Sequence, residues 1–271
     1  MNVYGHVLNA AKKKNKQTKN YMNIYEKKFA TIYDLLFGEQ TQDLEFYKYF
    51  IEKQNGPALE VGSGTGRLLI PYLQSGLQVE GVEPNKDMSD ICLTKANSIN
   101  VKPVIYQQFL EELKLTKKYN TIYMPLYAFQ HITKRSAAIK ALKNSYDHLE
   151  TNGQILISIF IPWNDPTGTY EQIWRIRNLY DSDGQQILLS ESVSYDKFEQ
   201  VQTKQLKYEI FKDNKLVESY LNTIEFRCYS IYELTIMLEQ AGFKDIEIFG
   251  DYTHAEANAS TDTFIFSGIK K

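Results

Sequence analysis

The stretch Pro57–Gly76, PALEVGSGTGRLLIPYLQSG, places three glycines at alternating positions directly after a short apolar run. The run ALEV is typical of a short buried strand, and the segment GRLLIPYLQSG indicates a helix that ends at Gly76. Gly62, Gly64 and Gly66 let the intervening chain turn sharply and approach a ligand with no Cβ atom in the way. The stretch therefore predicts a ligand-binding loop at the carboxyl end of a first strand.

Strands and helices alternate along the chain that follows this loop. Helices are expected at about residues 85–98 and 134–150. Such alternation is typical of an α/β domain built on a doubly wound, mostly parallel sheet. The further strands are expected in LQVEGVE (77–83), VKPVIYQ (101–107), YNTIYMPL (119–126) and NGQILISIFIP (152–162).

The pattern changes between residues 163 and 227, where no helical period is sustained. Runs of alternating polar and apolar residues are separated there by turn signals, which are Asp183-Gly184, Asp196-Lys197 and Asp213-Asn214. This segment predicts an antiparallel meander inserted into the α/β domain. A helix then returns at SIYELTIMLEQAGF (230–243), with a capping box at Ser230 and Glu233 and a stop at Gly242. Two closing strands are expected in KDIEIFG (244–250) and TDTFIFSGIKK (261–271).

Three regions follow from these patterns. Residues 1–55 form an N-terminal helical arm and cap, with two amphipathic helices separated near Gly38. Residues 56–162 and 228–271 form the α/β domain, and residues 163–227 form the inserted meander. The lysine run Lys12–Lys19 in the arm is typical of a solvated face, with a binding role as the alternative.

Composition restricts the kind of protein. The 271 residues are 43% apolar and 24% charged, as in ordinary globular proteins, and the formal net charge is −2. This balance gives no reason to expect nucleic acid as a partner. No apolar run is long enough for a transmembrane helix. The two cysteines are far apart and outside any metal-ligand spacing, so we expect reduced thiols, a cytoplasmic protein and no metal site.

Two residues around the glycine loop sharpen the kind of ligand expected. Arg67 stands where the dinucleotide fingerprint G-x-G-x-x-G has its third glycine, which disfavours a nicotinamide cofactor. Glu83 follows Gly62 by about 20 residues, at the end of the second strand, where a carboxylate can accept both hydroxyls of a ribose. The alternative for Glu83 is an acid that stabilises a helix N-terminus.

Glu60 is an unusual residue for a buried strand, because an unpaired buried carboxylate is costly and needs donors. It can bind the N–H groups of the loop, which would be a purely structural role. It can also bind a cationic ligand group, either directly or through water. The two roles are compatible.

Four segments resemble the class I S-adenosylmethionine-dependent methyltransferases: LEVGSGTGRLLIPYLQSG, VEGVEPNKDM, YNTIYMPLYAFQHI and LETNGQILISIFIP. The resemblance runs from about Tyr33 to the end of the chain. It implies a seven-stranded Rossmann-like sheet with its last strand antiparallel, and S-adenosylmethionine as cofactor. By this resemblance Glu60 and the loop hold the methionyl part, Glu83 holds the ribose, and Pro84 and Met88 flank the adenine. The residues that it assigns to the cofactor are Tyr33, Glu60, Gly62, Ser63, Gly64, Thr65, Gly66, Arg67, Glu83, Pro84, Met88, Gln108, Phe109, Leu110, Met124 and Pro125.

One segment departs from the family pattern. Many relatives end their third strand in Asp followed by Met near the adenine, whereas this chain has Phe109 and Leu110 there. The carboxylate that would accept from the adenine amino group is therefore missing. Gln108 or a backbone carbonyl is the expected substitute.

The segment MPLYAFQHI resembles the small-molecule N-methyltransferase branch, whose members carry a YDLLFG-like N-terminal segment and a β-rich lid. Tyr33 and Phe37 match aromatic positions that close over the cofactor, with core packing as the alternative. The meander matches the lid, and Trp163 at its start is expected to face the substrate. A homodimer interface is the alternative use of the meander. Arg175 and Arg177 are expected either to bind an anionic substrate group or to form salt bridges within the lid.

The expected reaction is methylation of a small molecule, on the nitrogen of an amine or amino sugar, by direct in-line transfer. A neutral amine needs only placement in a dry cavity, whereas a hydroxyl or ammonium group also needs a base. His131 is the best candidate for that base, although it can equally bind a loop carbonyl, and Tyr127 is a weaker candidate for orienting the substrate. The alternative functions are a non-catalytic S-adenosylmethionine-binding protein, an NAD-type oxidoreductase and, least favoured, an RNA methyltransferase.

Overall fold

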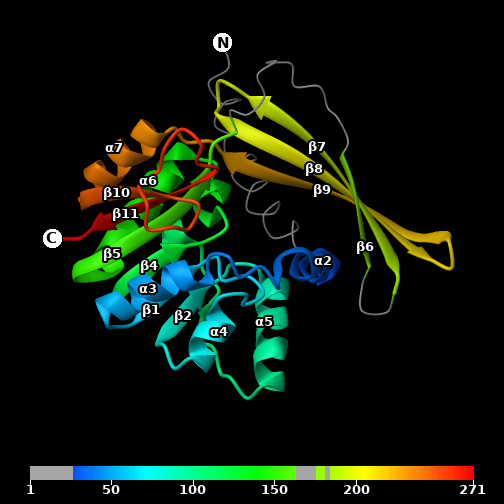
Figure 1. The fold of residues 1–271 in the computed structure, drawn as a ribbon, viewed down its shortest axis with the longest axis horizontal. Helices are drawn as coiled ribbons and strands as arrows, with labels where there is room; N and C mark the ends of the chain where they lie inside the picture. Colours follow the sequence, from blue (N-terminus) through cyan, green and yellow to red (C-terminus); the bar gives the residue numbers. More distant parts are fainter. Residues whose placement is uncertain (1–26, 163–174, 181–183) are drawn as a thin grey trace, which may run out of the picture.

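The computed structural model describes residues 27–162, 175–180 and 184–271 (Figure 1). The lysine run Lys12–Lys19 and the lid residue Trp163 lie outside the described residues. None of the described helices combines the length and the apolar composition needed to span a bilayer.

The α/β domain is built on a seven-stranded sheet with the order β10-β11-β5-β4-β1-β2-β3. Strand β1, which precedes the glycine loop, lies between β4 and β2 and runs parallel to both. Strand β11 is antiparallel to its neighbours β5 and β10. This arrangement confirms the predicted doubly wound, mostly parallel sheet with an antiparallel last strand. The strands are β1 (Ala58–Val61), β2 (Val79–Val82), β3 (Ile105–Tyr106), β4 (Tyr119–Met124), β5 (Leu149–Phe160), β10 (Lys244–Gly250) and β11 (Thr263–Ile269).

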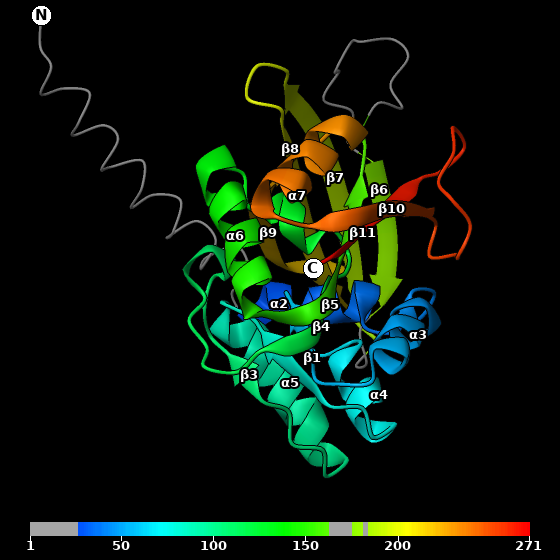
Figure 2. The ribbon, with the colours of Figure 1, turned by 90° about the vertical axis from the view of Figure 1, so that its left-hand side faces the viewer.

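Helices cover both faces of this sheet (Figure 2). Helices α3, α4 and α5 pack on one face, and α6 and α7 pack on the other. Strand β5 is apolar on both faces because its side chains alternate between them. Leu156 packs in the core beneath α3, α4 and α5, whereas its neighbours Ile155 and Ile157 pack in the core beneath α6 and α7. The helices are α2 (Lys27–Phe37), α3 (Leu44–Gln54), α4 (Leu69–Gln74), α5 (Lys86–Ser98), α6 (Arg135–His148) and α7 (Ile231–Ala241), with short 3₁₀ turns η1 (Leu110–Glu112) and η2 (Ala128–His131).

The predicted signals at both ends of α7 are present. The Ser230 side chain accepts a hydrogen bond from the Glu233 backbone N–H, and Gly242 ends the helix in a left-handed conformation with φ of 110°. Glycine tolerates this conformation because it has no Cβ atom. The Glu233 carboxylate forms an ion pair with Arg227 of β9 (Lys215–Arg227).

The inserted segment forms a second sheet of four antiparallel strands in sequence order, which confirms the predicted meander. Strands β8 and β9 are joined at Asp213 and Asn214, whose φ values of 50° and 59° suit a two-residue hairpin turn. We call this four-stranded sheet the lid sheet. Its strands are β6 (Arg175–Tyr180), β7 (Gln186–Asp196), β8 (Val201–Lys212) and β9 (Lys215–Arg227).

Helix α2 joins the lid sheet to the α/β domain. Phe29 and Ile32 share an apolar cluster with residues of β7 and β8, and the Phe29 ring packs edge-on against Tyr208 at 5.0 Å between centroids. Ala30, on another side of the same helix, packs with Met88 of α5. The chain ahead of the glycine loop therefore holds the two sheets together, as Figure 1 shows.

The third strand is shorter than predicted, because β3 spans only Ile105–Tyr106 rather than the whole of residues 101–107. It is the edge strand of the sheet, so it pairs only with β2. Pro103 lacks an N–H group and cannot donate to a ladder. The residues that follow β3 leave the sheet and enter η1 instead.

Candidate functional site

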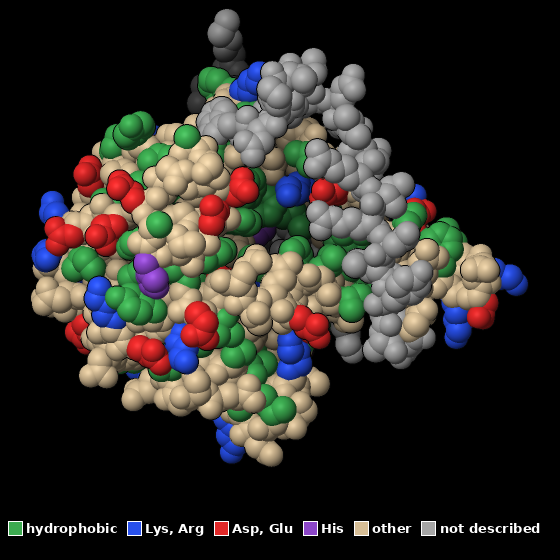
Figure 3. Space-filling model, viewed as in Figure 1, with side chains coloured by type: hydrophobic (Ala, Val, Ile, Leu, Met, Phe, Trp, Pro, Cys, Tyr) green, Lys and Arg blue, Asp and Glu red, His purple; other side chains and the backbone are tan. Residues whose placement is uncertain are grey.

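A cavity of about 550 Å³, which includes space at its open mouth, lies at the carboxyl ends of β1, β2 and β4. Figure 3 shows that the molecular surface is hollowed in its central part. All but two of the lining residues were predicted from the sequence; the exceptions are Leu126 and Ala128. The lining residues are Tyr33, Glu60, Gly62, Ser63, Gly64, Thr65, Arg67, Glu83, Met88, Pro125, Leu126, Ala128 and His131.

The glycine loop forms the floor of this cavity. Gly62 has a φ of 75°, and a Cβ atom on it would lie 2.8 Å from the Cβ of Ala128, so a side chain there is excluded. The hydroxyls of Ser63 and Thr65 are buried and have no hydrogen-bond partner among the described residues. Buried hydroxyls normally have partners, so these two are suited to bind polar groups of a ligand in the cavity.

Glu83 lies at the end of β2 with both carboxylate oxygens held by the backbone. Its Oε2 accepts from the Gly64 N–H at 3.0 Å, and its Oε1 accepts from the Asn85 N–H at 2.8 Å. Burial raises the pKa of Glu83 to about 7, and these two hydrogen bonds act against that rise. Each carboxylate oxygen has a second lone pair, so Glu83 can still accept from ligand hydroxyls.

Glu60 is buried on β1, with 2% of its surface exposed, and one of its oxygens accepts a hydrogen bond from the Tyr123 hydroxyl at 2.9 Å. Tyr123 is fully buried on the adjacent strand β4. Burial raises the pKa of Glu60 to about 8, while the Tyr123 hydrogen bond and the charge of Arg67 act against that rise. A ligand cation in the cavity would stabilise the ionised form.

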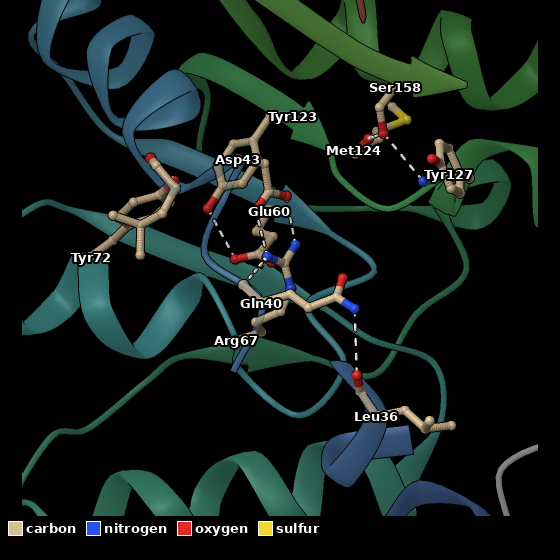
Figure 4. A network of polar contacts seen from close by, with 11 residues as sticks. Leu36, Gln40, Asp43, Glu60, Arg67, Tyr72, Tyr123, Met124, Tyr127 and Ser158 are labelled. Carbon is tan, nitrogen blue, oxygen red and sulfur yellow. Dashed lines mark hydrogen bonds and ion pairs between the residues drawn. The ribbon is translucent and has the colours of Figure 1, made fainter. Parts of the chain in front are cut away.

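Arg67 also lines the cavity, but its guanidinium is held from behind by an ion pair (Figure 4). Its two terminal nitrogens donate to the two carboxylate oxygens of Asp43 at 2.5 and 2.6 Å, and one of them also donates to the Gln40 carbonyl at 2.7 Å. Both side chains are buried, with 7% and 1% of their surface exposed. This bidentate pair attaches the glycine loop to the chain segment that begins α3.

The opposite wall of the cavity follows β4. Leu126 and Tyr127 both have positive φ, at 45° and 64°, a costly conformation for residues with a Cβ atom. Such strain is typical of segments that are shaped by function. The turn that follows carries His131 into the cavity wall.

The His131 ring packs against Phe226 of the lid sheet at 4.5 Å between centroids. Burial lowers the pKa of His131 to about 4; a hydrogen bond to the backbone of Glu225 acts against this, and the charge of Lys204 adds to it. The imidazole is therefore neutral near pH 7 and keeps one acceptor nitrogen. The alternative that His131 binds a backbone group is thus present in the structure, with the group on a lid strand rather than on a loop.

Tyr127, the second predicted catalytic residue, does not line the cavity. Its hydroxyl shares a 2.9 Å hydrogen bond with Thr263 of β11, and its backbone N–H donates to the Ser158 hydroxyl. Its ring packs edge-on against Phe160. These contacts correspond to a structural role at the end of the sheet.

Of the residues predicted to surround the adenine, Met88 lines the cavity, whereas the segment after β3 does not. Leu110 and Met124 are buried in the apolar core, and the Gln108 side chain accepts from the Lys114 backbone N–H at 2.9 Å. Phe109 precedes the turn η1. The predicted site residues that do not line the cavity are Gly66, Pro84, Gln108, Phe109, Leu110, Met124, Tyr127 and Phe37.

The aromatic pair predicted to close over the cofactor is divided between two places. Tyr33 lines the cavity, and burial raises its pKa to about 12. Phe37, one turn further along α2, packs against the Tyr33 ring at 4.9 Å between centroids. The side chains of Arg175 and Arg177 lie outside the described residues, and only their positions in β6 are given.

Several residues of the site were missed by sequence reasoning, namely Asp43, Tyr123, Leu126 and Ala128. Their contacts join segments that are distant along the chain, such as Tyr123 with Glu60 and Asp43 with Arg67. A signal was present only for Tyr123, whose place on the strand predicted to adjoin Glu60 could have suggested the pairing. Among the described residues, no group of three or more histidines, cysteines or acids is arranged to hold a metal ion.

The sequence model of a family described as "Methyltransferase domain" matches residues 39–248. The chain belongs to this methyltransferase family. An uncharacterized methyltransferase of Oceanobacillus iheyensis is 26% identical over an alignment of 146 positions, and the match covers 51% of this chain and 66% of that protein. The first three curated relatives are matched over less than two thirds of their own length.

Solved structures share the fold of this methyltransferase. An S-adenosylmethionine-dependent methyltransferase from Clostridium acetobutylicum has a TM-score of 0.72 at 17% identity, covering 89% of this chain and 97% of that one. A sugar N-methyltransferase from Streptoalloteichus sp. has a TM-score of 0.68 at 15% identity, covering 88% and 92%. The predicted fold class and family are both confirmed.

Proposed function

We propose that this chain transfers a methyl group from S-adenosylmethionine to a nitrogen of a small amine or amino sugar, by direct in-line attack. The observation that carries the proposal is the cavity itself. It joins the glycine loop, two buried carboxylates and a neutral histidine at the carboxyl ends of adjacent parallel strands. Family membership supports the methyl donor, and the sugar N-methyltransferase with a similar fold supports the acceptor class.

The residues of the cavity fit this cofactor. The loop leaves two buried hydroxyls, those of Ser63 and Thr65, available for its polar groups. Glu83 would accept from the ribose hydroxyls, and Glu60 would accept from the ammonium group, directly or through water. When bound, the sulfonium supplies a methyl group that is already activated for attack.

The charge of the cavity favours a cationic ligand over a dinucleotide. Glu60 and Glu83 line the cavity, whereas Arg67, the one arginine among the described lining residues, is neutralised by Asp43. A bound sulfonium or ammonium group favours the ionised form of these two acids, whereas a pyrophosphate would be repelled by them once ionised. This argument adds to the position of Arg67 in the glycine loop, which already disfavours an NAD-type oxidoreductase.

The low pKa of His131 favours nitrogen as the acceptor atom. A hydroxyl acceptor needs a base with a pKa near the working pH, and the pKa of His131 is about 4. A neutral amine attacks without prior loss of a proton, so placement in a dry cavity suffices. His131 then orients the amine through its acceptor nitrogen.

Methyl transfer itself is tested by incubating the protein with labelled S-adenosylmethionine and a panel of small amines, amino sugars and phenols. We expect label on amines or amino sugars. Calorimetry with S-adenosylmethionine, its demethylated product and NAD accompanies the panel. Binding of NAD alone would overturn the proposal, and cofactor binding without transfer to any acceptor would favour a non-catalytic binding protein.

Glu83→Ala is expected to weaken S-adenosylmethionine binding by at least about 1 kcal/mol, because ribose hydroxyls and the Gly64 N–H lose their acceptor. Calorimetry measures the change. Glu80→Ala is the matched control, since Glu80 lies on the same strand but binds Tyr106, Tyr119 and Lys117 outside the cavity. Equal affinity in the Glu83 variant and the wild type would remove Glu83 from the site.

His131→Ala is expected to lower turnover by about fivefold to tenfold, the effect of one lost hydrogen bond, while cofactor affinity stays unchanged. His131→Asn, which keeps an acceptor, should recover part of the loss. Steady-state kinetics with an acceptor from the panel measure both variants. A loss of about a hundredfold or more would instead identify His131 as a general base and contradict the orienting role.

Assembly and location stay predictions. The lid sheet could bind a second copy of the chain, and cytoplasmic location rests on composition alone. The division into residues 1–55, 56–162 with 228–271, and 163–227 also stays a prediction. Limited proteolysis and the molar mass in solution would test the division and the homodimer.

A further inference from the structure

Gln130, in the turn η2, is fully buried and uses its whole amide group on backbone atoms. Its Oε1 accepts from the Phe160 N–H at 2.9 Å. Its Nε2 donates to the Phe160 carbonyl at 3.1 Å and to the Arg227 carbonyl at 2.9 Å. Both amide hydrogens and one oxygen lone pair are therefore engaged.

The backbone atoms that Gln130 binds lie at the two places where the chain passes between the seven-stranded sheet and the lid sheet, which we call the two crossings. Phe160 is the last residue of β5, where the chain leaves the seven-stranded sheet, and Arg227 is the last residue of β9, where the chain returns from the lid sheet. One side chain thus connects both crossings. The contact is made of directional hydrogen bonds in a buried place, where each lost bond leaves a backbone group unpaired.

The turn that carries Gln130 also forms one wall of the cavity. Ala128 approaches Gly62 of the cofactor loop, and His131 follows Gln130 directly. The His131 ring rests on Phe226, the residue before Arg227. The position of η2 against the two crossings therefore determines how His131 faces the rest of the cavity.

We propose that Gln130 is a positioning residue for the acceptor side of the site, which fixes His131 by fastening η2 to the end of β5 and to the end of β9. The role in catalysis rests on the proposed methyl transfer, whereas the fastening does not. No hydrocarbon side chain can replace the amide, because it offers neither donors nor an acceptor. A carboxylate places an oxygen against two carbonyl oxygens.

The first test needs neither cofactor nor acceptor. His131 is one of four histidines, so its ring signals can be assigned by comparison with His131→Ala and followed by NMR through a pH titration. In Gln130→Met we expect the pKa of His131 to rise from about 4 towards its ordinary value of 6.5, because the loosened turn admits water. An unchanged His131 titration in this variant would overturn the proposal. Gln154→Met is the matched control, since Gln154 is another buried glutamine, whose amide donates to Ser267 at the far end of the sheet.

The second test uses Gln130→Glu and an acceptor from the panel. Its carboxyl regains one donor when it is protonated, so turnover relative to the wild type should rise as the pH falls. Calorimetry should show S-adenosylmethionine affinity within about twofold of the wild type, because the Gln130 amide bonds Phe160 and Arg227 and not the glycine loop. A relative turnover that is flat with pH would contradict the positioning role. If no acceptor is methylated by the wild type while the NMR result stands, the proposed function fails and the fastening by Gln130 survives.

Discussion

Arg67→Met is expected to lower the free energy of unfolding by about 3–5 kcal/mol, because it leaves the buried carboxylate of Asp43 without its cation. The pair is bidentate and lies where the chain enters α3, so its loss also frees the Gln40 carbonyl. Chemical denaturation monitored by circular dichroism measures the change. The ligand-free protein is used, so that altered cofactor binding does not enter the result.

Two further variants show whether the stability lost in Arg67→Met comes from the unpaired buried charge of Asp43 or only from the lost contact. Arg67→Met combined with Asp43→Leu removes both charges and should recover a large part of the stability, because no ion is then left unpaired. Lys86→Met removes one partner of the exposed pair Lys86–Asp90 and should cost less than about 1 kcal/mol. A cost for Arg67→Met as small as that of Lys86→Met would show that Asp43 is solvated in the folded protein.

The sequence predicted the alternation of strands and helices well, because hydrophobic period and turn residues are local signals. The buried strand β1, the helix α5 begun by Asn85 and the hairpin turn at Asp213 and Asn214 each depend on a few neighbouring residues. Strand β3 was predicted too long, because an edge strand needs pairing on one side only and its end is set by the partner β2.

The candidate site was predictable where it lies in one motif and unpredictable where it joins distant segments. The loop from Gly62 to Thr65 and the acid Glu83 line the cavity. Both could be predicted because the glycine spacing and the distance from Gly62 to Glu83 are typical of a ligand-binding loop. The contact of Arg67 with Asp43, and that of Gln130 with Phe160 and Arg227, depend on how separate elements pack. Such contacts cannot be predicted from the spacing of residues along the chain. Arg67 lines the cavity, and the ion pair of its guanidinium with Asp43 could not be predicted from its position in the loop.

Binding of S-adenosylmethionine is expected to strengthen by more than about tenfold between about pH 6 and pH 7.5, because its ammonium group requires an ionised Glu60. Burial holds the pKa of Glu60 near 8 in the free protein, so the carboxyl is mostly protonated at the lower pH and must release a proton on binding. Glu83, with a pKa of about 7, adds to the same trend. Calorimetry in two buffers of different ionisation enthalpy measures both the affinity and the proton released.

Glu60→Gln is the variant that assigns the effect. It removes the ionisable group while keeping an acceptor for the Tyr123 hydroxyl, so we expect weaker binding with a much smaller pH dependence. Glu83→Gln should retain most of the dependence, because Glu60 has the higher pKa of the two acids. A pH dependence in Glu60→Gln as steep as that of the wild type would exclude Glu60 as the ammonium ligand.

Glu60 also makes the stability of the cofactor-free protein depend on pH in a predictable direction. The folded state raises the pKa of Glu60 from 4.5 to about 8, so the folded protein binds a proton more tightly than the unfolded chain does. The contribution to stability is therefore fully present below pH 4.5 and is lost as the pH rises through about 8. Glu60→Gln should flatten this decline in denaturation experiments, and bound S-adenosylmethionine should oppose it because the ligand cation stabilises the ionised carboxylate. A buried acid next to the glycine loop thus destabilises the free protein near neutral pH, and the proposed contact with the cofactor's ammonium group would offset that cost.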